Sequence, residues 1–94
     1  MWVIVVEESG ERTPQQWAVM ADPACRTWAT ENGHHVRILD RDSKDEPEWI
    51  AEAAGKPLPF VFLVAPDGVA RWSGSLPSTA GEMLKLLKQH GAEK

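Results

Sequence analysis

Residues 55–72 read GKPLPFVFLVAPDGVARW, and no other stretch of the chain says as much about the fold. The run from Phe60 to Ala65 is continuously apolar and follows a proline, the pattern of a strand covered on both faces. Pro66-Asp67-Gly68 is typical of a turn. Val69 to Trp72 carries a charge, as an edge strand does. The stretch therefore predicts an antiparallel hairpin whose first strand is central.

Two more strands are expected before this hairpin. Trp2 to Val6 is a second continuous apolar run, which predicts another central strand. His35 to Leu39 alternates and carries charge, which predicts an edge strand.

Three helices are expected between and after these strands. Thr13-Pro14-Gln15-Gln16 offers an N-cap hydroxyl, a proline at the first helical position and a capping-box glutamine. This helix should end at Asn32-Gly33, and Pro23 should split it after Met20, with Asp22 capping the second half. The second helix should begin near Asp45–Glu48 and end before Gly55. The third should run from Thr79 to His90.

The resulting order is β-α-β-α-β-β-α in a chain of 94 residues, which is enough for one domain, residues 1–94. Right-handed crossovers make the first two strands parallel, and the tight turn makes the last two antiparallel. With the two apolar strands in the centre, the prediction is an α/β protein. Its four-stranded mixed sheet has spatial order 2-1-3-4 and is flanked by three helices.

This order resembles the thioredoxin fold in its minimal form, over nearly the whole chain. Leu58-Pro59 looks like the X-Pro of that family, so the resemblance implies that Pro59 is cis and faces the active site. Gly74, placed after the last strand, and Pro23 in the first long helix are also features of the family.

Redox-active relatives open the first helix with Cys-x-x-Cys, where the helix N-terminus lowers the thiol pKa. The corresponding residues here are 11–17, ERTPQQW. Laying Pro14 over the proline of a Cys-Gly-Pro-Cys motif places Arg12 and Gln15 at the cysteine positions. Dithiol exchange is therefore excluded, and no catalytic residue is expected.

Cys25 is the one cysteine, so no internal disulfide is possible. It lies roughly 18 Å beyond Thr13 along an unbroken helix, out of reach of a substrate at Pro59. We expect it to fill the core.

The net charge of −4 and the absence of a basic run argue against nucleic-acid binding. The apolar runs are too short to cross a membrane, and the N-terminus lacks the pattern of a signal peptide, so a cytoplasmic location is expected. His34 and His35 are expected to be exposed rather than metal ligands. The segment from Asp40 to Asp45 is expected to be a polar loop, because it lacks the glycine of an EF-hand. We expect no metal and no cofactor.

The resemblance implies a shallow groove where the main chain before the cis-proline pairs with an extended peptide. We therefore expect a redox-inactive adaptor, monomeric or weakly oligomeric, that binds a protein or peptide. Trp17 would lie at the rim and Trp72 is a further possible contact, whereas Trp2, Trp28 and Trp49 are expected in the core. Two alternatives stay open: a single-cysteine redox or glutathione-transferase-like enzyme domain, and a structural subunit of an assembly. The expected groove residues are Arg12, Thr13, Pro14, Gln15, Trp17, Leu58 and Pro59.

Overall fold

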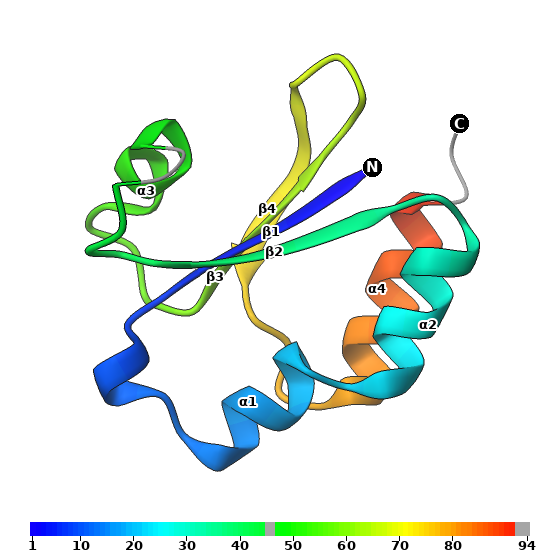
Figure 1. Cartoon of the computed structure of the whole chain (residues 1–94), viewed down its shortest axis with the longest axis horizontal. Coiled ribbons are helices and arrows are strands. Elements are labelled where there is room, and N and C mark those ends of the chain that lie inside the picture. The colour runs from blue at the N-terminus through cyan, green and yellow to red at the C-terminus, as the bar shows by residue number, and fades with distance from the viewer. Residues whose placement is uncertain (45–46, 92–94) are drawn as a thin grey trace.

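A computed structural model describes residues 1–44 and 47–91 of the chain (Figure 1). The strands and helices follow the predicted order, with a short 3-10 helix, η1, added after the first strand. The elements are β1 (Trp2–Glu7), η1 (Ser9–Glu11), α1 (Pro14–Met20), α2 (Pro23–Glu31), β2 (His35–Asp40), α3 (Pro47–Ala53), β3 (Phe60–Val64), β4 (Ala70–Ser75) and α4 (Ala80–Gly91).

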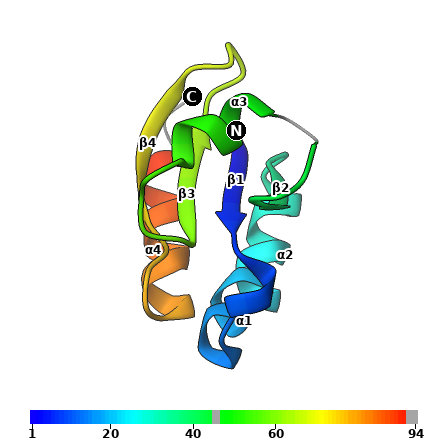
Figure 2. The same cartoon turned by 90° about the vertical axis from the view of Figure 1, so that its left-hand side faces the viewer.

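The strands form one mixed sheet in the order β2-β1-β3-β4, which confirms the predicted topology (Figure 2). β1 and β2 are parallel, whereas β3 is antiparallel to both β1 and β4. The two continuously apolar strands occupy the centre because helices cover both of their faces.

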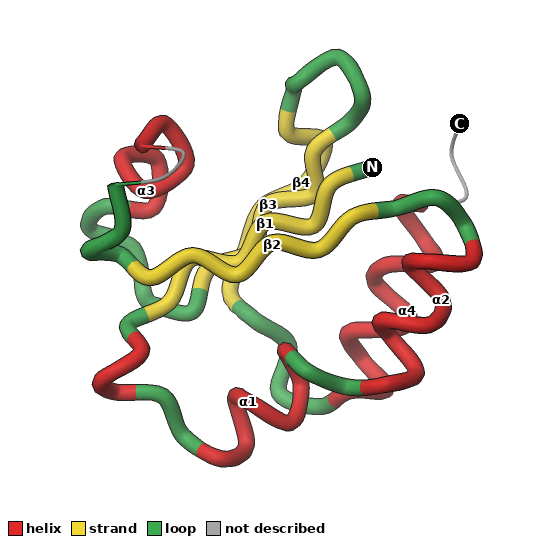
Figure 3. The backbone as a smooth tube through the Cα atoms, viewed as in Figure 1, coloured by secondary structure: helices red, strands yellow, loops and turns green. Residues whose placement is uncertain are grey.

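Alternate residues of β1 and β3 point to opposite faces, so each face has its own core. Helices α1, α2 and α4 cover one face, and α3 covers the other (Figure 3). The first core contains Val3, Val5, Val19, Met20, Cys25, Val61, Leu63, Met83 and Leu87. The second contains Ile4, Val6, Leu39, Ala53, Phe60, Phe62 and Val64.

The first expected helix is divided into α1 and α2, as predicted. Pro23 has no N–H to continue the helix, and the Asp22 carboxylate accepts a hydrogen bond of 2.9 Å from the N–H of Cys25. α3 begins at Pro47, so its expected cap at Asp45 and Glu46 lies outside the described residues. No helix in the described ranges has the length and apolarity needed to cross a bilayer.

The β3–β4 turn contains Gly68 at φ +84°, a conformation that other residues rarely adopt. β4 runs to Ser75, beyond its predicted end, so Gly74 lies inside the strand and not after it. A Cβ on Gly74 would lie 2.8 Å from the Trp72 ring. Glycine is needed there because the indole of Trp72 lies against the strand.

Two predictions about burial are wrong. Trp2 was expected in the core but is 38% exposed at the start of β1, where the His35 ring stacks on it with the ring centroids 4.4 Å apart. His34 was expected to be exposed but is buried. Its Nδ1 lies 3.1 Å from the N-terminal nitrogen, and its ring packs against Trp28. Trp28 and Trp49 are half-buried at the edges of the two cores.

Side chains pack closely around Gly91, the last residue of α4. A Cβ there would lie 2.5 Å from Cη2 of Trp28 and 3.0 Å from Nε2 of His34. We expect Gly91→Ala to lower the free energy of unfolding by about 1–2 kcal/mol, because the overpacking exceeds the gain in helix propensity. Urea unfolding measures the change.

The matched control is Gly81→Ala in the first turn of α4, where an added Cβ meets nothing within 4 Å. That variant should be as stable as the parent chain or slightly more stable. Equal stabilities for the two variants would contradict the close packing at Gly91.

Candidate functional site

The predicted groove lies where β1 ends and β3 begins. Val6 pairs with Phe60 in this antiparallel ladder, so the next residues along, Glu7 and Pro59, lie side by side. The Leu58–Pro59 peptide bond is cis. Pro59 is buried and Leu58 is half-buried. Leu58 is therefore the residue of this pair that reaches the surface.

The first turn of α1 is held in place by its own cap and by a distant loop. The hydroxyl of Thr13 accepts a hydrogen bond of 3.1 Å from the N–H of Gln16, whose side chain accepts one of 3.0 Å from the N–H of Thr13. This reciprocal pair is the predicted capping box. The side-chain amide of Gln15 donates to the carbonyl of Ser78 at 3.1 Å. The start of α1 is therefore fixed against the loop between β4 and α4.

The same loop contacts the start of β3. The N–H of Leu76 donates to the carbonyl of Pro59 at 3.1 Å. Residues 76–78 thus connect the two halves of the predicted groove, although the sequence analysis did not include them. The predicted hairpin could have located this loop, because an antiparallel β4 must end beside the start of β3.

The main chain of Leu58 is open, by which we mean that its polar groups have no hydrogen-bond partner in the described part of the chain. Among residues 1–44 and 47–91, neither its N–H nor its carbonyl takes part in a hydrogen bond. Both groups are strong hydrogen-bonding groups that seek a partner. The site therefore offers one donor and one acceptor of main-chain type beside the end of a sheet.

An ion pair between the buried Glu7 and the exposed Arg12 connects the sheet to the rim of this site. Glu7 is 2% exposed, and its carboxylate accepts two hydrogen bonds from the Arg12 guanidinium, one of them 2.8 Å long from Nε. The hydrogen bond with Glu7 raises the pKa of Arg12 above its ordinary value. Arg12 also stacks over the Trp17 ring, 4.3 Å from its centroid. Sequence reasoning missed Glu7, although a charged residue directly after a buried strand was a signal.

On the α3 side of Leu58 there is a cleft of about 590 Å³. η1, the segment after β2, and the segment from α3 to Leu58 form its walls. Its lining mixes apolar and charged side chains, and includes Val6, Glu8, Glu11, Arg41, Asp42, Ile50, Ala53, Lys56 and Leu58.

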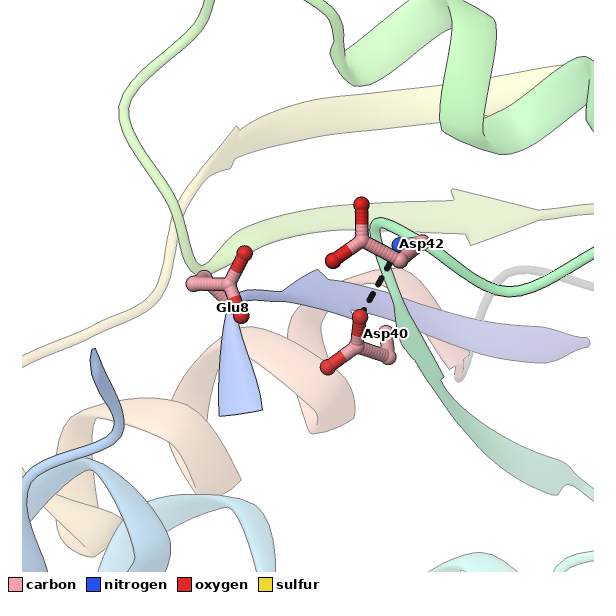
Figure 4. Close-up of side chains that lie close together, drawn as sticks. All are labelled: Glu8, Asp40 and Asp42. Atoms are coloured by element: carbon pink, nitrogen blue, oxygen red, sulfur yellow. Dashed lines mark hydrogen bonds between the residues drawn. The ribbon is translucent and has the colours of Figure 1, made fainter. Parts of the chain in front are cut away.

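The carboxylates of Glu8, Asp40 and Asp42 lie close together where β1 and β2 end (Figure 4). Their ligand atoms lie within 4.8 Å of one another, a spacing that suits a hard cation such as Ca²⁺. Hydrogen bonds from Ser9 are the main cause that lowers the pKa of Asp40, and the N–H of Asp42 also donates to it at 2.9 Å. Glu8 pairs with Arg41. Internal partners therefore occupy two of the three groups, Glu8 and Asp40.

Cys25 lies on α2 in the first core and is 5% exposed. Burial raises the pKa of its thiol to about 12, and Asp22 adds to the rise. The thiol donates to the carbonyl of Ala80 at 3.6 Å, so the neutral form is the one that fits. Cys25 is a core residue, as predicted.

The structure brings the expected groove residues to one end of the sheet through the contacts of Glu7 and of residues 76–78. Thr13, Pro14 and Gln15 are exposed there. Trp72 is half-buried and packs against the first core, with the His90 ring 6.1 Å away. No known protein family, curated protein or solved structure matches the chain.

Proposed function

We propose that this chain is a redox-inactive protein of the thioredoxin-like superfamily that binds an extended segment of another protein. The binding site would be the end of the sheet that contains the start of α1, Leu58 and residues 76–78. The open main chain of Leu58 carries this proposal. An extended segment can pair with such groups by strand addition, which requires no thiol.

The rim of the site supports the proposal. Trp17 is 43% exposed, and Arg12 stacks on its ring while its guanidinium is held by Glu7. An exposed indole with an arginine stacked on its ring is the kind of anchor that protein interfaces favour. Residues 76–78 would form the opposite wall.

The chemistry of the chain favours binding over catalysis. Dithiol exchange needs two thiols, and Cys25 is a single buried one. A glutathione-transferase-like site would use the residues at the start of α4, but the hydroxyl of Thr79 already accepts from the N–H of Glu82 at 3.1 Å. We also propose a cytoplasmic location, because a reducing compartment keeps Cys25 as the free thiol that the fold contains.

The test begins with a random seven-residue peptide library, selected on the immobilised full-length chain. An enriched peptide is then titrated into nitrogen-15-labelled protein. We expect the amide resonances of Leu58, Leu76, Ser78 and the first turn of α1 to shift. Shifts confined to the middle of α2 and α4 would contradict the proposal, as would a selection that enriches nothing.

A matched pair of tryptophan variants tests the rim. We expect Trp17→Ala to weaken binding of the enriched peptide about tenfold, as the loss of an aromatic anchor does. Trp2→Ala should leave the affinity unchanged. Trp2 is comparably exposed, at 38%, but lies at the start of β1, the opposite end of that strand. Equal effects of the two substitutions would place the peptide elsewhere.

A further inference from the structure

The cleft on the α3 side of Leu58 determines which side chains a bound segment can carry. This specificity rests on the proposed function, because the segment must pair with the main chain of Leu58. The side chain of Leu58 packs against the second core, on the face that α3 covers. In a paired strand, successive side chains point to opposite faces. Every second side chain of the segment would therefore point toward this cleft.

The floor of the cleft is apolar. Ile50 and Leu58 are half-buried and form its accessible part, above the buried side chains of Val6 and Ala53. The volume of about 590 Å³ leaves space for a long side chain. A floor of this kind suits the methylene stem of such a side chain.

The rim of the cleft is charged, with three carboxylates and two cations. Arg41 is committed to the carboxylate of Glu8. Within residues 1–44 and 47–91, Glu11 and Asp42 have no ion-pair partner. Lys56 lies over the Phe60 ring, with its nitrogen 5.7 Å from the centroid. The rim therefore keeps an excess of negative charge at Glu11 and Asp42.

We propose that the cleft receives a lysine or arginine side chain of the bound segment. The apolar stem lies along Ile50 and Leu58, and the cationic head lies between Glu11 and Asp42. Lysine and arginine combine an apolar stem with a charged end, and the cleft offers both surfaces in one place. The partner is therefore an extended segment with a basic residue at the position that faces α3.

The peptide selection tests this specificity separately from the proposed function. We expect the enriched peptides to shift the Leu58 amide and to share lysine or arginine at one position. Enriched peptides that shift Leu58 without a basic preference would overturn the specificity and leave the proposed function standing. A selection that enriches nothing, or shifts confined to other elements, would overturn both.

Removing a negative charge from the rim and removing a positive one should change the affinity for a basic peptide in opposite directions. With an enriched basic peptide, Glu11→Gln and Asp42→Asn should each weaken binding about two- to fivefold, the effect of one exposed charge pair. Lys56→Gln should tighten it by a similar factor, because it removes a like charge. Glu31→Gln, the same change at the exposed end of α2, should have no effect. Unchanged affinity in both carboxylate variants, or weaker binding with Lys56→Gln, would overturn the proposal.

Discussion

Iodoacetamide should alkylate Cys25 at least about a thousandfold more slowly in the folded protein than in urea at pH 8. The thiolate is the reacting form, and burial raises the pKa of this thiol from 9.0 to about 12. Each pKa unit lowers the thiolate fraction tenfold at a pH below both values. The thiol is also 5% exposed, so the reagent has little access to it. Mass spectrometry of the labelled fraction over time measures both rates.

The reaction in urea supplies the reference, and the chain has one cysteine, so each label reports Cys25. A native rate within tenfold of the urea rate would contradict the burial and revive a single-thiol redox function.

The same pKa shift has a consequence for stability. The fold favours the neutral thiol, so this stabilisation is present below about pH 9 and is lost as the pH rises toward about 12. The loss should be absent in Cys25→Ala.

Leu87→Ala should lower the free energy of unfolding by about 3 kcal/mol, within the range for buried leucines that leave a cavity. Leu87 is 1% exposed and packs from α4 onto the first core. A domain of this size has a total stability of about 5–15 kcal/mol, so the variant should unfold at a clearly lower urea concentration.

Lys88→Ala is the matched control, because it removes the exposed neighbouring side chain from the same helix. We expect its free energy of unfolding to stay within about 0.5 kcal/mol of the parent value. A loss below about 1 kcal/mol for Leu87→Ala would contradict the placement of α4 on the sheet.

Several local features of the fold follow from the sequence alone. The division between α1 and α2 followed from Pro23, and the Asp22 cap followed from the residue before it. The capping box at Thr13 and Gln16 formed as expected. These features depend on residues four or fewer apart, so the nearby sequence is enough to specify them.

The candidate site was predictable only in part. Thr13, Gln15 and Leu58 belong to segments that the fold brings to one end of the sheet, as the topology implied. The wall formed by residues 76–78 was missed, as was the burial of Glu7. The contact between Glu7 and Arg12 depends on how the chain turns through η1, which no local pattern indicated.

The sequence by itself determined the order of the elements, the central position of β1 and β3, and the absence of a second thiol. Apolar periodicity and residue identity carry that information along the chain. Only the tertiary structure decided that Trp2 is exposed, that His34 is buried and that a charged cleft opens beside Leu58. These outcomes depend on which part of each sheet face a helix covers. The coverage of each face depends on packing between segments far apart in the chain, so no short stretch of sequence predicts it.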